Sequence, residues 1–274
     1  MEVKVLGSAR EVGRSAVLLK SSSVNLLLDF GVLVQKEIGF PVHVQPKDVD
    51  AILLSHAHLD HSGALPLFYL SNGPKTYTTP LTLELTRLLI EDFLRISGFY
   101  LPFEYIDLLE MMKKTIAISP NETVKISDFE VTFYDAGHIP GSTSILLEGE
   151  GKRILYTGDI NDEDTQLLKG ADYEVGELDL LITESTYATE DHPPRKDVEE
   201  SFVEYAKEVV ERGGVLFVPA FSVGRAQEVA CVLYSYNFPY QIYMDGMALK
   251  TNEILFRYPE YLRNPRLFRK AINN

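Results

Sequence analysis

The chain lacks tryptophan altogether and has a single cysteine, Cys231, among its 274 residues. One cysteine cannot form an intrachain disulfide, and it excludes a cysteine-based zinc finger. Cys231 lies in the apolar run Val229–Leu233, so we expect a buried core thiol. A chain without disulfides is typical of a reducing compartment, and we therefore expect a cytoplasmic protein.

Long apolar runs are missing as well. From Met1 the sequence passes directly into strand-like alternation, without the charged and apolar regions of a signal peptide. No apolar run approaches the roughly 20 residues that a membrane-spanning helix needs, so no membrane partner is expected. With 45% hydrophobic residues the chain can still bury a core, and its length suits one large domain or one domain with part of a second.

Positive charge is scarce, and the net charge is −14. Such an acidic chain is not expected to bind nucleic acid non-specifically over a large surface. The segment 257–270 is an exception, because it holds five basic residues and one acidic residue. Charge alone does not select a partner.

The apolar periodicity changes near residue 190. Residues 1–190 mostly alternate with the period of two that predicts strands, with helical spacing at 80–96 and 103–112. The remaining chain predicts, in order, helix 197–212, strand 215–218, helix 224–236, strand 241–243 and helix 248–258. Alternating strands and helices are typical of a parallel sheet. We predict an α/β fold, with one domain over 1–190 and an α/β domain with a parallel sheet over 191–274.

Histidine is also rare, with six in the chain, yet three fall within His56-Ala57-His58-Leu59-Asp60-His61. This stretch directly follows the predicted strand 51–54. Histidine and aspartate are zinc ligands, and a catalytic zinc site keeps one position open for water. The stretch therefore predicts a hydrolytic metal site, whereas we expect His43 and His192 to be ordinary core or surface residues.

Other candidate ligands also follow predicted strands. His138, Asp159 and Asp29 each come shortly after an apolar strand, and strand ends on one rim of a sheet can converge on a point. His56, His58 and His138 could bind one metal, Asp60 and His61 a second, and Asp159 could bridge them. Two metals roughly 3.5–4 Å apart stabilise the attacking and leaving oxygens of a displacement.

These motifs, in this order, resemble the metallo-β-lactamase superfamily over about the first 160 residues. The resemblance implies an αββα sandwich with the metals at one edge. It assigns one Zn²⁺ to His56, His58 and His138 and the other to Asp60 and His61, with Asp159 bridging. Asp29 would orient a histidine ligand, as carboxylates behind metal ligands commonly do.

Three further segments resemble the β-CASP branch of this superfamily, whose members act on nucleic acids. They are the loop Gly7–Ser15, the strand end Thr183–Tyr187 with its acidic Glu184, and Pro219–Glu228. The last is most similar to the RNA-processing members, namely the cleavage-and-polyadenylation endonuclease and its archaeal relatives. The resemblance implies single-stranded RNA as the substrate, with catalytic roles for Asp60, Asp159 and Glu184.

The segment Pro219–Glu228 also predicts a phosphate site on physical grounds. A predicted strand ends at Val218, Ser222 is placed to cap the following helix, and Arg225 lies in its first turn. A hydroxyl, backbone N–H groups and a guanidinium at a helix start can bind an RNA phosphate. In the alternative interpretation, Arg225 merely pairs with Glu228 or another surface acid.

The chain departs from the β-CASP pattern near its end. In that branch the first domain resumes after the insertion and supplies two more histidines, but here no histidine follows His192. We expect a truncated product of a longer gene rather than a natural short form, with an incomplete second zinc site and weak or no activity. Family members often dimerise through C-terminal regions, which implies a homodimer for the longer protein.

The leading hypothesis is therefore a zinc-dependent ribonuclease in which a hydroxide activated by two metals attacks phosphorus and leaves a 5′-phosphate end. Two alternatives stay open. A small-molecule hydrolase of the same superfamily, such as a thioesterase, would explain the acidic charge but not Pro219–Glu228. A non-catalytic RNA-binding or scaffold subunit would not explain the intact set His56, His58, Asp60 and His61.

Overall fold

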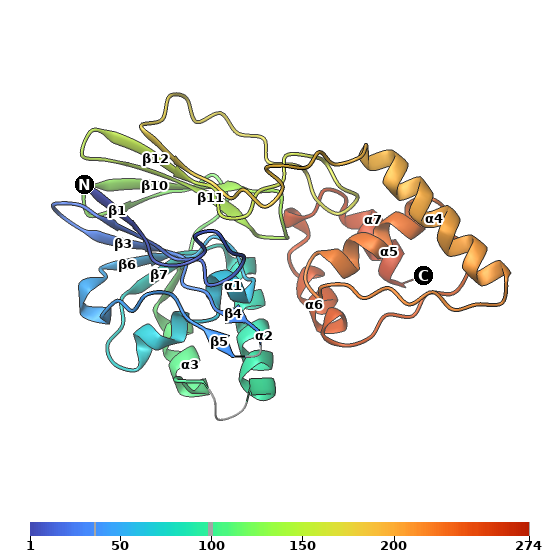
Figure 1. The fold of residues 1–274 in the computed structure, drawn as a ribbon, viewed down its shortest axis with the longest axis horizontal. Coiled ribbons are helices and arrows are strands. Elements are labelled where there is room, and N and C mark those ends of the chain that lie inside the picture. The colour runs from blue at the N-terminus through green and yellow to red at the C-terminus, as the bar shows by residue number, and fades with distance from the viewer. Residues whose placement is uncertain (36, 98–100, 274) are drawn as a thin grey trace.

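The computed structural model describes residues 1–35, 37–97 and 101–273. Two large sheets face each other in the first part of the chain (Figure 1). The six-stranded sheet has the order β1 (Glu2–Val5), β2 (Val17–Lys20), β3 (Asn25–Leu28), β6 (Ala51–Leu53), β7 (Lys75–Thr78) and β8 (Thr115–Ala117). The five-stranded sheet has the order β13 (Leu180–Ile182), β12 (Lys152–Tyr156), β11 (Thr143–Gly149), β10 (Phe129–Asp135) and β9 (Thr123–Ile126). A short hairpin pairs β4 (Leu33–Val34) with β5 (Ile38–Gly39).

Alternate residues of the strands build two cores, because successive strand residues point to opposite faces. Leu26, Leu28 and Leu53 point towards the five-stranded sheet and meet Phe129 and Phe133 in the core between the sheets. Their neighbours Leu27 and Ile52 point to the other face, where they pack against helices.

Helices cover the outer face of the six-stranded sheet. Helix α2 (Pro80–Ser97) follows β7, and α3 (Tyr105–Lys114) leads into β8 (Figure 1). Phe93 of α2 and Leu108 of α3 are buried in the core against this sheet. Short helical turns, α1 (Leu59–Ser62) and a 3₁₀ turn at Leu65–Tyr69, connect β6 to β7. The α/β sandwich predicted from the sequence is confirmed.

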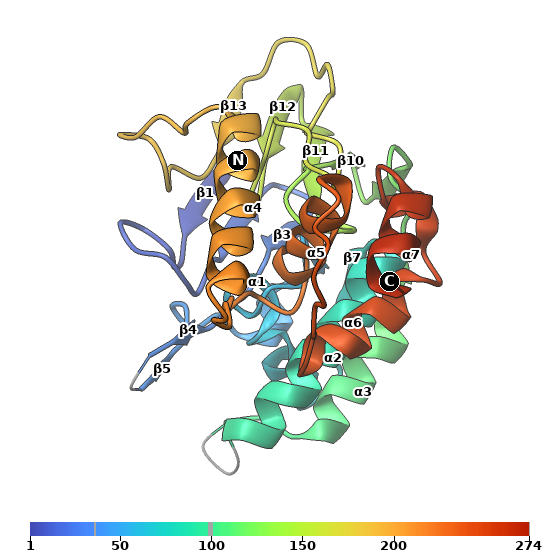
Figure 2. The same ribbon diagram turned by 90° about the vertical axis from the view of Figure 1, so that its right-hand side faces the viewer.

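The second part of the chain holds α4 (Arg195–Glu211), α5 (Arg225–Ser235), α6 (Met247–Leu255) and α7 (Pro265–Asn273), with a 3₁₀ turn at Pro259–Tyr261 between the last two. Another 3₁₀ turn, at Pro46–Asp48, precedes β6 in the first part. Helix α6 packs against α2, as the view in Figure 2 shows. One buried cluster spans this contact, with Leu81 and Leu85 from α2, Cys231 from α5 and Leu255 from α6. Cys231 is thus the buried core thiol that the sequence predicts.

The strands predicted at 215–218 and 241–243, and with them a parallel sheet in this part, are wrong for the described residues. Both segments are without ladder partners, and Val215, Phe217 and Tyr243 are 90%, 85% and 85% exposed. An apolar segment becomes a strand only where a neighbour accepts its backbone hydrogen bonds. The division into domains 1–190 and 191–274 stays a prediction, and Asn274 lies outside the described residues.

None of the helices within residues 1–35, 37–97 and 101–273 is both long and apolar enough to cross a bilayer.

Candidate metal centre

The rims of the two sheets meet at the residues predicted to bind metal. His56 and His58 follow β6, His138 follows β10 and Asp159 follows β12. The N–H of Thr143, at the start of β11, donates to the carbonyl of Ser55 over 2.8 Å and ties the rims together. Gly158 turns the chain towards this seam with a φ of +57°, and a Cβ there would lie 2.8 Å from the Ser55 side chain. A side chain at residue 158 would therefore displace Asp159.

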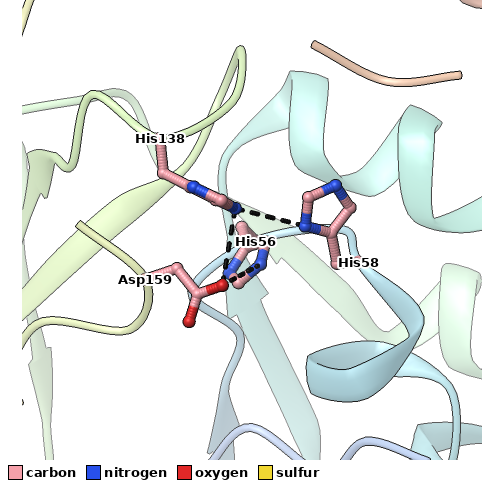
Figure 3. Close-up of side chains that lie close together, drawn as sticks. All are labelled: His56, His58, His138 and Asp159. Carbon is pink, nitrogen blue, oxygen red and sulfur yellow. Dashed lines mark hydrogen bonds and ion pairs between the residues drawn. The ribbon is translucent and has the colours of Figure 1, made fainter. Parts of the chain in front are cut away.

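Four donor side chains converge in what we call the first cluster, formed by His56, His58, His138 and Asp159 (Figure 3). His138 Nε2 lies 3.2 Å from His58 Nδ1 and 3.5 Å from Asp159 Oδ2. His56 Nε2 lies 3.8 Å from the same carboxylate oxygen. Donors on a tetrahedral ion with bonds of about 2.0–2.1 Å stand about 3.3 Å apart. The spacing of the first cluster therefore fits a tetrahedral divalent metal ion.

The hydrogen bonds of His56 prepare it to bind a metal. Ser55 Oγ donates to Asp29 Oδ2 over 2.6 Å, so the His56 Nδ1–H donates to Ser55 Oγ over 3.0 Å. The Nε2 atom is left with a free lone pair, and it is buried without a hydrogen-bond partner among the described residues. Unpaired buried polar atoms are costly in a finished protein, which favours an ion in this place.

The first cluster is electrostatically tuned for neutral histidine. Burial, followed by the neighbouring histidines, lowers the pKa of His56 well below its usual range. Burial and His138 lower the pKa of His58 to about 4. Burial also lowers the pKa of His138. Metal ions bind the neutral imidazole, so this cluster is in its ligand form at neutral pH.

The second cluster consists of Asp60 and His61, with His56 shared, and its donor atoms also lie within 4.8 Å of one another. His61 Nε2 lies 3.9 Å from Asp60 Oδ2 and 3.2 Å from Asp159 Oδ1. Asp159 thus turns Oδ2 to the first cluster and Oδ1 to His61. Its predicted role as a bridge between two metals stays a prediction, and this geometry is compatible with it.

His61 differs from the other histidines because a carboxylate lies behind it. Its Nδ1–H donates to Asp29 Oδ2 over 2.7 Å. Burial by itself would lower the pKa of His61, but the charge of Asp29 and the hydrogen bonds to Asp159 and Asp29 raise it well above the usual value. Burial would raise the pKa of Asp159, yet the hydrogen bond from His61 lowers it to about 2.

Asp29 is the centre of a buried hydrogen-bond network. Its carboxylate accepts hydrogen bonds from Ser55 N at 2.7 Å, from His61 and from the hydroxyl of Tyr156 at 2.7 Å. The structure thus places Asp29 where it fixes the ring of His61, as the sequence predicts. Tyr156 was not foreseen, because a tyrosine at the end of an apolar strand has the same pattern as a core residue.

An open cleft of about 510 Å³ lies beside the second cluster. It is lined by Arg10, Ser15, Asp60, His61, Asp159 and Glu184. Glu184 Oε1 accepts a hydrogen bond from the N–H of Ile160 over 3.1 Å, which holds this carboxylate next to the Asp159 turn. The structure therefore brings all three predicted catalytic carboxylates, Asp60, Asp159 and Glu184, to one cleft.

Of the two predicted phosphate residues, Arg225 is the first residue of helix α5. Arg225 is exposed, and its positive charge contributes to the lowered pKa of His138. The alternative pairing with Glu228 is wrong, because Glu228 forms an ion pair with Arg195 and accepts the N–H groups of Gln166 and Leu167. Within the part of the chain that the structure describes, the Arg225 guanidinium has no ion-pair partner.

Ser222 does not cap helix α5, contrary to the sequence prediction. The helix begins at Arg225 with Gly224 as its N-cap, and the Gln227 side chain accepts the N–H of Gly224 over 2.9 Å. The Ser222 carbonyl instead accepts a hydrogen bond from Gln227 Nε2 over 3.1 Å. His192 lies outside both clusters, with its ring 4.3 Å from that of Tyr187, and His43 is exposed, as expected for histidines without a metal role.

Curated proteins of known name are similar to this chain over nearly its whole length. The chain is 43% identical to "RNase aCSPSF2" of Saccharolobus solfataricus, over 99% of this chain and 56% of that protein. It is 43% identical to "Probable RNase MJ4" of Methanocaldococcus jannaschii, over 100% of this chain and 66% of that protein. It is 39% identical to "Transcription termination factor FttA" of the same organism, over 96% of this chain and 44% of that protein. The chain thus spans roughly half to two thirds of their length, and they confirm the predicted resemblance to archaeal β-CASP proteins.

The fold and the sequence profile agree on the family. A crystal structure of a protein of unknown function from Enterococcus faecalis V583 has the same fold, with a TM-score of 0.51 and 18% identity over 75% of this chain and 57% of that one. The profile described as "Metallo-beta-lactamase superfamily" matches residues 9–211, which include every ligand of both clusters. The chain belongs to the metallo-β-lactamase superfamily.

Proposed function

We propose that the chain carries the active site of a zinc-dependent ribonuclease that hydrolyses phosphodiester bonds of single-stranded RNA. The observation that carries the proposal is the first cluster, whose donor atoms have the spacing of a tetrahedral site. It is supported by relatives named RNases at 43% identity over nearly the whole chain. We also propose the cytoplasm as the location of the protein and a homodimer as its assembled state.

The donor set favours zinc among the divalent metals. Imidazole nitrogens dominate both clusters, and carboxylates supply the rest, without any thiolate. Imidazole suits zinc well, whereas magnesium and calcium prefer oxygen ligands throughout. Zinc, when bound, supplies Lewis-acid stabilisation of phosphoryl oxygens and lowers the pKa of bound water.

The side chains of the chain itself have separate tasks in this proposal. Asp159, with its pKa lowered to about 2, stays ionised and joins the two clusters. Asp60 and Glu184 face the cleft on the side of the second cluster, where an attacking water and the departing 3′-oxygen must exchange protons. Arg225, which has no ion-pair partner within the described residues, offers its guanidinium to a phosphate next to the one that reacts.

The weakest part of the proposed site is the second cluster, which offers two donors of its own and shares His56 with the first. We therefore expect the chain to cleave RNA slowly. The test is a single-turnover reaction with zinc-loaded protein in excess over a 3′-labelled single-stranded RNA. The proposal predicts slow cleavage that leaves 5′-phosphate ends and stops on addition of a chelator or in His58→Ala.

Two parallel substrates make the test specific. A thioester and a β-lactam are offered under the same conditions, because small-molecule hydrolases also occur in this superfamily. Hydrolysis of either, with RNA left intact, would contradict the proposal. RNA binding without chelator-sensitive cleavage at any protein concentration would instead identify a non-catalytic RNA-binding chain. Arg225→Ala is expected to weaken RNA binding about tenfold and to reduce its salt dependence by about one counterion.

A further inference from the structure

A large aromatic side chain is exposed to solvent beside the first cluster. Phe221 is 77% exposed, although phenylalanine is among the residues most often buried. The centre of its ring lies 6.2 Å from that of His58, with the two planes inclined at 45°. The exposed ring thus borders the histidines that are placed to hold the metal, and the sequence gives no hint of this contact because 163 residues separate the two side chains.

The segment that carries Phe221 is fixed to the metal centre by packing. The Phe221 carbonyl accepts a hydrogen bond from the N–H of Ala226 over 3.0 Å, which closes a tight loop into α5. Val223, two residues on, is buried in the same cluster as Ile139, the neighbour of the ligand His138. Gly224, with a φ of +84°, approaches Ile139 so closely that a Cβ would lie 2.9 Å from its Cγ2. The loop bearing Phe221 therefore keeps its position relative to His138.

A cation accompanies the ring. Arg225 is four residues beyond Phe221 and is exposed, and it directly follows Gly224, which packs against Ile139 beside His138. An aromatic face and a guanidinium on one rim of a metal centre match the two parts of a nucleotide, because bases stack on aromatic rings and phosphates pair with arginine. A hydrophobic small molecule would use the ring but leave the guanidinium without a counter-charge.

We propose that Phe221 forms a nucleobase-stacking subsite that holds the base of a nucleotide adjacent to the phosphate at the first cluster. The inference rests on the proposed function, since it deepens the recognition of RNA at the same site. One aromatic face without surrounding polar groups distinguishes bases poorly, because every base has a π-face. The subsite accordingly holds single-stranded RNA in place without selecting its sequence.

The absence of tryptophan from the chain gives a direct test. Phe221→Trp introduces the only tryptophan of the chain, whose emission can be excited apart from that of the 15 tyrosines. Its emission is followed as the zinc-loaded protein is titrated with a phosphorothioate-linked oligoadenylate that resists hydrolysis. Stacking predicts strong quenching by this oligomer, and none by an oligomer of the same length whose nucleotides lack bases. Tyr205→Trp serves as the matched control, because Tyr205 is also exposed, at 55%, but lies on α4 at the outer side of the helices (Figure 1). It should show no quenching with either oligomer.

Affinity supplies the second measurement. Phe221→Ala should bind the oligoadenylate about tenfold more weakly than the natural chain, whereas the base-free oligomer should bind both equally. Phe221→Leu, which keeps an apolar side chain, should behave like Phe221→Ala if stacking matters. Oligoadenylate binding that is the same in all three chains, with no quenching in Phe221→Trp, overturns the subsite while the proposed function stands. Failure of the natural chain to bind either oligomer overturns both.

Discussion

The two donor clusters are adjacent and share His56, yet their chemistry differs. The first is built from three histidines with lowered pKa values and Asp159, and the Nε2 atom of His56 in it is buried without a hydrogen-bond partner among the described residues. In the second, His61 has a raised pKa, and its neighbours face an open cleft. Burial acts in the same direction on all four histidines, so it cannot be the cause of the difference.

The cause is Asp29. This buried carboxylate accepts a hydrogen bond from His61 Nδ1–H, and its negative charge stabilises the positively charged form of His61. The first cluster can take up a metal ion without losing a proton. The second must release one. We call the metal sites at the first and second clusters the first and second positions. We therefore expect the first position to fill before the second and to hold its metal more tightly.

The largest effect is expected from His58→Ala, which removes a donor of the first cluster only. With one of its four donors gone, the first position should lose its metal on dialysis, and cleavage of RNA should fall at least about a hundredfold. Metal content after dialysis, measured by elemental analysis, checks the first part. His192→Ala is the matched control, since His192 lies outside both clusters. Full retention of metal by His58→Ala would refute the assignment of the first cluster.

Asp29→Asn should weaken metal binding at the second position more than at the first, which Asp29 reaches only through Ser55. The substitution keeps the size of the side chain but removes the charge that orients and polarises His61. The loss of such a partner typically weakens metal binding by about 10- to 100-fold. Competition with a chromophoric chelator measures the two affinities separately. Thermal unfolding of the metal-free variant shows whether the fold survives, and equal weakening of both positions would argue against a role specific to His61.

The two positions should also differ in their dependence on pH. His61 has a pKa above its usual value of about 6.5, so the metal-free chain carries this proton below that raised pKa. Affinity at the second position should therefore rise about tenfold per pH unit through the neutral range and level off above the raised pKa. The pKa of His58 is about 4, and those of His56 and His138 are also lowered. The first position should change little between pH 6 and 8.

Calorimetry in two buffers of different ionisation enthalpy checks this prediction. The second binding event should release about one proton and the first close to none. Proton release of equal size in both events would mean that the neighbours of His61 do not control its charge.

The smallest effect is expected from Tyr156→Phe. It removes one hydrogen bond to Asp29 and leaves the charge of Asp29 and its bonds to Ser55 and His61 in place. A hydrogen bond to a charged group contributes about 1.5–3 kcal/mol to stability. Losing this one affects His61 only indirectly, through a small change in how firmly Asp29 is held. We expect the second metal to bind a few-fold more weakly, as measured by the same chelator competition. An effect as large as that of Asp29→Asn would show that Tyr156 has a more direct role.

The residues of the two clusters were predictable from the sequence because their signal is local. His56, His58, Asp60 and His61 lie within six residues, and His138, Asp159 and Asp29 each follow an apolar strand. Once those strands are placed in two sheets, the side chains at their ends meet on the seam. The α/β sandwich follows from the same periodicity.

What the sequence did not predict depends on contacts between distant segments. Tyr156 donates a hydrogen bond to Asp29 although 127 residues separate them in the sequence, and no motif near either residue predicts this bond. Gly224 and Gln227 take the capping role expected of Ser222, because α5 begins three residues later than Ser222. The segments 215–218 and 241–243 have strand-like composition but no strand to pair with among the described residues. Amino-acid composition indicates that a segment can form a strand, but a strand forms only where a neighbouring segment pairs with its backbone.

The most direct test of the account combines metal loading with cleavage. Metal-free protein is titrated with zinc, and single-turnover cleavage of a labelled single-stranded RNA is followed at each addition. We predict almost no cleavage up to one equivalent, a rise between one and two equivalents, and complete loss on addition of a chelator. Cleavage that is complete at one equivalent, or that persists in chelator, would contradict a ribonuclease site built from two unequal metal positions.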